Sequence, residues 1–245
     1  MFQIKNISVM LNDTSNVKDI SLTIKSGDIH VLMGPNGSGK SSLAHALMGH
    51  PSYCITHGLV AINGENISNL KPYERARAGL LLLMQQPPAL SGVKVSSFLQ
   101  EAYTALHGPI TFGEFYEQLI TYMDILEIDY SFAYRAVNEG FSGGEKKKFA
   151  ILEMLILKPK VVIIDEIDSG LDVDAIKIVA RGIRYFQEMN PHSSLLLITH
   201  YQRIVTFFEV AKVYILIHGR IVASGDANLL TQIDKEGYDR FASQK

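Results

Sequence analysis

The chain has 245 residues, a length that suits one large α/β domain or a core with a sizeable insertion. Hydrophobic residues make up 47% of it and charged residues 20%, which is ordinary for a folded chain and argues against intrinsic disorder. The formal net charge of −2 argues against a nucleic-acid binder that works by bulk electrostatics.

Two further features concern membranes and cellular compartment. Apolar runs such as Leu80–Met84 are far shorter than the roughly 18–20 residues that span a bilayer, so we expect no membrane insertion. The first ten residues alternate like a strand and lack the basic and apolar regions of a signal peptide, so we expect the cytoplasm. Cys54 is the single cysteine, which excludes an intrachain disulfide. One thiol also cannot hold an iron–sulfur cluster or a structural zinc, because these take about four ligands.

The first third of the chain contains several apolar, strand-like stretches. Asn63-Gly64 is a turn signal at the end of one of them. A short apolar run ends in Gly34, and a loop and a helix-forming stretch follow at once. We predict strands at residues 2–11, 20–24, 28–34, 58–64 and 79–85, and helices at 40–48 and 72–77.

The spacing of apolar residues changes between Pro87 and about Leu157. Here apolar residues recur at helical spacing without a strong strand signal, as in Phe115, Leu119, Tyr122, Met123 and Leu126. Further strands are expected at 160–166, 193–200, 213–217 and 220–225, with a helix near 173–186. Strands that alternate with helices around a helical insertion predict an α/β fold with a mainly parallel core sheet. We expect one domain over residues 1–245, with an N-terminal antiparallel β region and a helical lobe at about 87–157.

The stretch GPNGSGKS follows a predicted strand and opens a predicted helix, the context expected of a phosphate-binding loop. Its glycines let backbone amides close on phosphate oxygens, Lys40 neutralises the β- and γ-phosphates, and the Ser41 hydroxyl is a ligand for Mg²⁺. The predicted nucleotide-binding residues are Gly34, Pro35, Asn36, Gly37, Ser38, Gly39, Lys40, Ser41 and Ser42.

A second set of candidates lies in VVIIDE, an apolar strand that ends in two acids. Carboxylates at the end of a buried strand need a partner, because an unpaired buried charge is costly. Mg²⁺ provides one for Asp165, and Glu166 is then placed to orient or deprotonate a water. Read alone, an apolar run followed by two acids is common, so this assignment depends on the loop at Lys40.

A second anion-binding geometry is predicted about a hundred residues after the first. Ser142, Gly143 and Gly144 stand at the start of a predicted helix, with Glu145 in its first turn. Small residues at a helix start leave backbone amides exposed to an approaching anion. These residues alone do not say which anion binds there.

Taken together and in this order, GPNGSGKS, Gln85, FSGGE, VVIIDE, SGLD and His200 resemble the ABC-type ATPases over essentially the whole chain. The resemblance implies ATP bound head to tail between two copies, hence a transient ATP-dependent homodimer, with Mg²⁺ and a hydrolytic water. It implies that Gln85 senses Mg²⁺ and the water, that His200 contacts the γ-phosphate, and that Asp172 lies in the loop linking the two sites. Without it, Gln85 would be read as a surface residue and His200 as a structural one.

The resemblance also implies an answer for the second anion-binding loop. Ser142, Gly143 and Gly144 would reach the γ-phosphate held by the other copy. This chain departs from the family in having Phe141 for the commoner Leu and Glu145 for the commoner Gln. It also lacks an aromatic residue in 9–17 to stack on adenine, so Val17 or a neighbour would give only apolar contact. Weak adenine affinity or tolerance of other nucleotides would follow.

Three stretches, GFSGGEKKK, DEIDSGLDVDAIK and THYQRI, resemble the SufC branch of this family, the ATPases of an iron–sulfur cluster assembly complex that also contains SufB and SufD. That resemblance implies SufB/SufD-like scaffold partners and clusters built on another chain. A membrane-transporter ATPase subunit is the alternative, because such subunits also lack membrane spans. An ATP-gated clamp that barely hydrolyses ATP is a third hypothesis.

One regulatory hypothesis concerns Asp168, two residues after Glu166. We hypothesise that Asp168 pairs with a lysine of the run Lys146–Lys148, most plausibly Lys147, and influences where Glu166 points. Hydrolysis would then stay low until partners arrive. The alternative is a solvated lysine cluster on a helix face, since exposed ion pairs contribute little.

Overall fold

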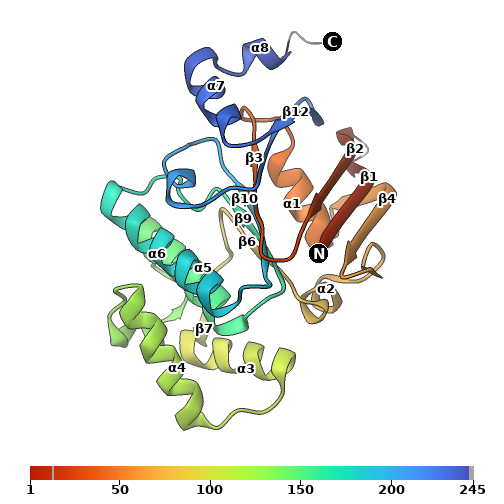
Figure 1. Cartoon of the computed structure of the whole chain (residues 1–245). Helices are drawn as coiled ribbons and strands as arrows, with labels where there is room; N and C mark the ends of the chain where they lie inside the picture. Colours follow the sequence, from red (N-terminus) through yellow and green to blue (C-terminus); the bar gives the residue numbers. More distant parts are fainter. Residues whose placement is uncertain (13, 243–245) are drawn as a thin grey trace. The chain divides into compact units, whose positions relative to one another are not determined.

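The computed structural model describes residues 1–12 and 14–242. The chain divides into two compact units, which are described separately (Figure 1). Unit 1 comprises Met1–Leu82, Lys160–Glu166 and Pro191–Lys245, and unit 2 comprises Leu83–Pro159 and Ile167–Asn190. The helical lobe expected at residues 87–157 lies within the first segment of unit 2, to which the structure adds 167–190.

Unit 1 contains a six-stranded sheet in the order β12-β11-β3-β10-β9-β6. Strand β10 pairs in parallel with β3 and with β9, and β11 pairs in parallel with β3. At one edge of this sheet, β11 and β12 form an antiparallel hairpin. The mainly parallel α/β sheet is therefore confirmed. The strands span Ile29–Met33 (β3), Leu80–Leu83 (β6), Val161–Asp165 (β9), Ser194–Ile198 (β10), Lys212–Ile217 (β11) and Arg220–Gly225 (β12).

The central strands are buried along their whole length, which explains their composition. Every residue of β3, β9 and β10 is buried. Strands covered on both faces require continuous apolar runs in place of alternation. In the register of β10 and β9, Ile198 lies beside Asp165, so the carboxyl ends of the two strands finish together. This edge positions the acidic residues of the candidate site.

The second sheet of unit 1 is antiparallel and has the order β2-β1-β4-β5, as expected for the N-terminal region. Asn63 and Gly64 both have positive φ, 50° and 88°, as a tight two-residue hairpin turn requires. Strand β4 begins at Tyr53, earlier than the predicted start at residue 58. The strands span Phe2–Leu11 (β1), Thr14–Ile24 (β2), Tyr53–Ile62 (β4) and Glu65–Asn66 (β5).

One buried cation holds the helices of this region together. The guanidinium of Arg75, on α2, donates to the carbonyls of Ala46 and Leu47 at 2.9 and 2.6 Å, and to those of Ser68 and Leu70 at 2.5 and 2.9 Å. Ala46 and Leu47 belong to the last turn of α1, where carbonyls lack the usual amide four residues on, and that of Ala46 also accepts from the amide of Gly49 at 3.0 Å. The helices of unit 1 are α1 (Lys40–Met48), α2 (Pro72–Ala78), α7 (Asn228–Glu236) and α8 (Asp239–Ala242), with a 3₁₀ turn at Val205–Phe207.

Unit 2 is mainly helical. Its helices α5 and α6 pack closely at Gly182, where an added Cβ would lie 2.6 Å from Cγ2 of Ile151 and 2.6 Å from Cδ2 of Leu126. It also contains a short two-stranded sheet that pairs β7 with β8, in a part of the chain that carries no strong strand signal. The elements are β7 (Leu90–Lys94), α3 (Val95–His107), α4 (Phe112–Ile125), a 3₁₀ turn (Tyr130–Tyr134), β8 (Ala136–Val137), α5 (Gly143–Leu157) and α6 (Val173–Met189).

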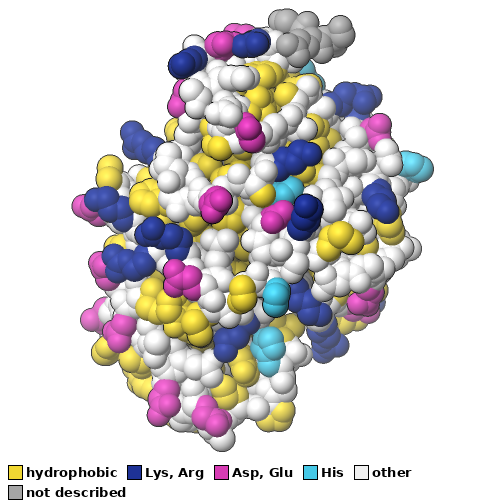
Figure 2. Space-filling model, in the orientation of Figure 1, with side chains coloured by type: hydrophobic (Ala, Val, Ile, Leu, Met, Phe, Trp, Pro, Cys, Tyr) yellow, Lys and Arg dark blue, Asp and Glu magenta, His cyan; other side chains and the backbone are white. Residues whose placement is uncertain are grey.

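Two surface properties bear on function. Among the described residues, no helix combines the length and the hydropathy needed to cross a bilayer. On the face drawn in Figure 2, lysine and arginine side chains are interspersed with aspartate and glutamate. This mixed pattern accords with the net charge of −2 and lacks, on that face, the continuous basic stripe typical of nucleic-acid binders.

Candidate functional site

The phosphate loop, Gly34–Ser41, connects β3 to α1, as predicted. Gly39 is the N-cap of α1, with φ 107°, and no side chain caps the helix start. Gly34 has no room for a side chain, since a Cβ there would lie 2.1 Å from the carbonyl oxygen of Leu216. The amides of the first turn are therefore left available to an anion, with the positive end of the helix dipole behind them.

Main chain from two other strands encloses this loop. The amide of Gly219, in the β11–β12 turn, donates to the carbonyl of Ser38 at 2.8 Å, and the amide of Lys18 donates to the carbonyl of Gly219 at 2.7 Å. The Ser38 hydroxyl is buried and has no hydrogen-bond partner among the described residues. A buried hydroxyl without a partner is unfavourable, and a bound phosphate oxygen would supply one. Sequence reasoning did not find this enclosure, because it depends on segments far apart in the chain.

Lys40 is buried at the start of α1 with its ammonium turned back onto the loop. Its Nζ donates to the carbonyls of Gly34 and Pro35 at 2.9 and 3.1 Å. It also lies 3.8 Å from Oε1 of Glu166. Burial lowers the pKa of Lys40, and the carboxylates of Glu166 and Asp165 partly offset this. The ammonium is thus positioned where phosphate oxygens could replace carbonyls as its acceptors.

Glu166 follows the last residue of β9 and is buried with its carboxylate beside Lys40 and His200. Its Oε1 lies 3.2 Å from Nδ1 of His200, which follows β10. The amide of Glu166 donates to the carbonyl of Ile198 at 2.9 Å. Its φ of 48° is in the left-handed region, where a residue with a side chain is strained. The structure therefore brings Lys40, Glu166 and His200 together at the carboxyl edge of the sheet.

The residues of unit 1 fit a nucleoside triphosphate with Mg²⁺. Helix α1 packs against β9, so the Ser41 hydroxyl and the buried Asp165 carboxylate are carried by neighbouring elements. Both are oxygen donors, the type that Mg²⁺ prefers, and Mg²⁺ is usually bound by one or two carboxylates together with substrate phosphates. The unpartnered Ser38 hydroxyl and the uncapped start of α1 fit the phosphates.

Val17 itself is not available for the expected apolar contact to a base, and a contact from a neighbour stays a prediction. Val17 is fully buried, and its Cγ2 would lie 3.3 Å from a Cβ placed on Gly39. Val17 therefore packs against the phosphate loop at Gly39. Its neighbour Asn16 donates from Nδ2 to the Ser42 hydroxyl at 3.4 Å, so the group that β2 places beside the loop is polar.

The other predicted site residues lie in unit 2. Gln85 is exposed, and its carbonyl accepts a hydrogen bond from Nζ of Lys147 at 3.2 Å. Asp172 is the N-cap of α6, where its Oδ1 accepts from the amide of Ala175 at 2.8 Å. Gln85 and Asp172 thus belong to unit 2, whereas the Lys40 cluster belongs to unit 1.

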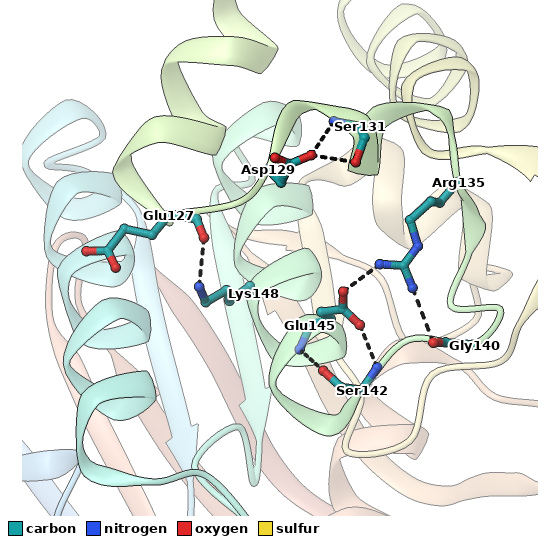
Figure 3. A network of polar contacts seen from close by, with 8 residues as sticks. All are labelled: Glu127, Asp129, Ser131, Arg135, Gly140, Ser142, Glu145 and Lys148. Atoms are coloured by element: carbon teal, nitrogen blue, oxygen red, sulfur yellow. Dashed lines mark hydrogen bonds and ion pairs between the residues drawn. The ribbon is translucent and has the colours of Figure 1, made fainter.

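The signature loop, Phe141–Glu145, opens α5 with a capping box, as its spacing predicts (Figure 3). The Ser142 hydroxyl accepts from the amide of Glu145 at 3.2 Å, and the Glu145 carboxylate accepts from the amide of Ser142 at 2.7 Å. Ser142 and Gly143 are exposed. Arg135 lies 2.5 Å from Glu145, a contact that sequence reasoning missed.

The lysine run after this loop is not a uniformly solvated cluster. Lys147 keeps 6% of its full solvent exposure and Asp168 keeps 4%, so both are buried. The solvated alternative is therefore wrong for Lys147, while Lys146 and Lys148 are half-buried. The pairing of Asp168 with Lys147 stays a prediction.

Comparison with known proteins gives consistent results. Residues 17–169 match the family described as ABC transporter. The chain is 42% identical to "Vegetative protein 296" of Bacillus subtilis over 239 residues, covering 96% of this chain and 91% of the relative. It is 41% identical to a probable ATP-dependent transporter of Synechocystis, covering 100% and 96%. A solved ATP-binding subunit of an ABC transporter superposes with a TM-score of 0.82 at 22% identity, covering 99% and 100%.

Proposed function

The chain belongs to the ABC transporter family as an ATP-binding ATPase subunit, and we propose that it hydrolyses ATP with Mg²⁺ to drive iron–sulfur cluster assembly on a SufB/SufD-like scaffold. In this proposal ATP binding joins two copies, and the joined pair remodels the scaffold in the cytoplasm. The alternative is the ATPase subunit of a membrane transporter, an activity that the Synechocystis relative, a probable ATP-dependent transporter, favours.

The placement of Glu166 carries the proposal of hydrolysis. Its carboxylate lies between the Lys40 ammonium and the His200 imidazole, at 3.8 and 3.2 Å. A water beside Glu166 would give its proton to the carboxylate and attack the γ-phosphorus, while the bond from that phosphorus to the bridging oxygen breaks. Lys40 stabilises the developing negative charge on the phosphate oxygens, and His200 orients Glu166.

Ser41 and Asp165 would hold Mg²⁺, with Gln85 as a further oxygen donor once the site is assembled. Bound Mg²⁺ supplies Lewis-acid stabilisation of the phosphate oxygens. Pairing of two copies would bring Ser142, Gly143 and Gly144 to the γ-phosphate held by the partner copy, with Asp172 in the loop between the sites. The exposure of Ser142 and Gly143 supports this role.

The hydrolysis test compares the purified protein with Glu166→Gln and Lys40→Ala. We expect Glu166→Gln to bind ATP and to lose turnover by about 100-fold or more, because the general base is gone. Lys40→Ala should lose ATP binding itself. Negligible turnover in both the parent protein and Glu166→Gln, even in the presence of a partner, would instead support the ATP-gated clamp.

The scaffold partner is supported by the SufC-like stretches and by the single cysteine. With Cys54 as its one thiol, this chain could act as the motor while clusters form on another chain. We propose residues 86–93 as the docking segment, because β7 is exposed along its full length.

The partner test is affinity purification of Glu166→Gln from native lysate with Mg-ATP, followed by mass spectrometry. Recovery of SufB/SufD-like proteins supports the assembly role. Recovery of an integral membrane subunit supports the transporter alternative. Leu90→Asp with Val93→Asp is the matched variant, since both side chains are exposed and the pair should abolish recovery without unfolding the protein.

A further inference from the structure

Arg135 lines a cavity of about 280 Å³ beside the start of α5. Its Nη1 lies 2.5 Å from Oε1 of Glu145, and its Nη2 donates to the carbonyl of Gly140 at 3.2 Å (Figure 3). The guanidinium also lies over the rings of Phe132 and Phe141, 5.1 and 4.7 Å from their centroids. These contacts fix the cation in one position against the signature loop.

Glu145 places a negative charge at a helix start that is expected to bind an anion. The ion pair with Arg135, together with the amide and hydroxyl of Ser142, lowers the pKa of the Glu145 carboxyl. The carboxylate is therefore ionised at neutral pH. It stabilises the helix start, yet it would repel a phosphate that approaches the same turn.

The capping box also determines which donors remain for an anion. It uses the amides of Ser142 and Glu145. The amides of Gly143 and Gly144 are in the first turn and have no partner within the helix. The Ser142 oxygen already accepts from Glu145, so its hydroxyl hydrogen is available to donate outward. The remaining donors thus lie directly beside the ionised Glu145.

The other charges around the cavity are engaged elsewhere. Nζ of Lys148 donates to the main-chain carbonyl of Glu127 at 2.9 Å, and the Glu127 carboxylate lies 2.9 Å from Arg181. The Asp129 carboxylate accepts from the amide and hydroxyl of Ser131 at 2.9 and 2.5 Å (Figure 3). Among the described residues, Arg135 is therefore the cation paired with Glu145.

We infer that Arg135 is a positioning residue that cancels the charge of Glu145, so that the signature loop can accept the terminal phosphate of ATP bound to a second copy. This rests on the proposed ATP-dependent pairing. A loop with an uncharged residue at position 145 would not need the arginine. Glutamine there would keep the capping box, since its side-chain carbonyl can accept from the Ser142 amide.

The test uses analytical ultracentrifugation with Mg-ATP in a Glu166→Gln background, which preserves bound ATP. Adding Arg135→Met should weaken pairing by about tenfold or more, because an unneutralised carboxylate would face the phosphate. Adding Glu145→Gln as well should restore pairing close to the parent level. ATP binding by the separated copies should be the same in all variants. Raising the salt concentration should partly relieve the defect of Arg135→Met.

The outcomes separate this inference from the proposed function. A parent protein that never pairs would overturn the proposed function and the inference with it. A parent that pairs, with no loss in Arg135→Met, would overturn the inference alone. A double variant as poor as Arg135→Met would also overturn it, because the arginine would then act only through Phe132, Phe141 and Gly140.

Arg181→Met is the matched control. It removes an arginine of the same unit from an ion pair with Glu127, whose carboxylate is not at a helix start. We expect Arg181→Met to pair like the parent, and a defect equal to that of Arg135→Met would contradict the inference. Thermal unfolding of each variant measures any loss of stability. A loss that Glu145→Gln does not reverse would come from the contacts of Arg135 with Phe132, Phe141 and Gly140 and not from the charge of Glu145.

Discussion

Nδ1 of His200 lies 3.2 Å from Oε1 of Glu166, so an imidazole contacts the carboxylate proposed as the general base. The two residues follow neighbouring parallel strands, β10 and β9, whose ends are aligned by the pairing of Ile198 with Asp165. Glu166 has strained backbone geometry, and contacts from its surroundings must maintain it. His200 supplies one such contact.

His200→Ala should therefore lower turnover and leave ATP binding intact. A misplaced general base costs about 10²-fold in rate, which is the loss expected at saturating ATP. Steady-state kinetics would give the split between kcat and KM. His192→Ala is the control, because this exposed histidine of the same unit uses its main-chain carbonyl to accept from Ser26. A rise in KM with kcat unchanged would contradict the orienting role.

Asp168→Asn should raise basal ATPase activity in the absence of partners. The hypothesised pair of Asp168 with Lys147 would restrain Glu166, and Asn removes the charge that makes the pair. Lys147→Met should act in the same direction, and the double variant should add little to either single change. Lys146→Met, a half-buried neighbour, is the control. Unchanged basal activity in Asp168→Asn would exclude the restraint.

Thermal stability should fall as pH rises, owing to Glu153. This half-buried residue of α5 has its pKa raised from 4.5 to about 8 by burial. The folded state keeps a proton that the unfolded chain releases. The contribution of this proton to the free energy of unfolding is therefore complete below about pH 4.5 and is lost as the pH rises towards 8. Glu153→Gln should raise Tm at pH 8 and leave it nearly unchanged at pH 5. Glu188 is exposed, so Glu188→Gln should change Tm equally at the two pH values. Parallel curves of Tm against pH for the two variants would contradict the prediction.

Gly182→Ala should destabilise the protein by about 1–3 kcal/mol, the usual cost of overpacking. The new methyl group would lie 2.6 Å from atoms of Ile151 and Leu126. Gly113 in α4 provides the matched control, since nothing lies within 4 Å of an added Cβ there. Gly113→Ala should stabilise the helix by about 0.5–1 kcal/mol. Urea unfolding measures both, and similar effects at the two positions would argue against close packing at Gly182.

Much of the fold could be predicted because its strands are buried on both faces. The continuous apolar runs of β3, β9 and β10 are visible without any tertiary information. Strand β7 could not be found in this way. It is exposed throughout, and it exists through pairing with the two-residue β8, whose contribution no periodicity reveals.

The candidate site divides in the same manner. Lys40 and Ser41 are predicted well because the whole loop is contiguous in sequence. The strain at Glu166 and the unpartnered hydroxyl of Ser38 depend on distant chain segments, so the motif alone could not show them. The burial of Val17 depends on its packing against the phosphate loop, so the local sequence of β2 alone could not show it.

Arg75 has a consequence beyond the local capping of α1. Its guanidinium joins the end of the helix that carries Lys40 to Ser68 and Leu70, in the segment that leads into α2. It thus acts as a crosslink made of hydrogen bonds. Reductants that open disulfides would leave it intact, which suits a chain whose one thiol has no second cysteine to bond.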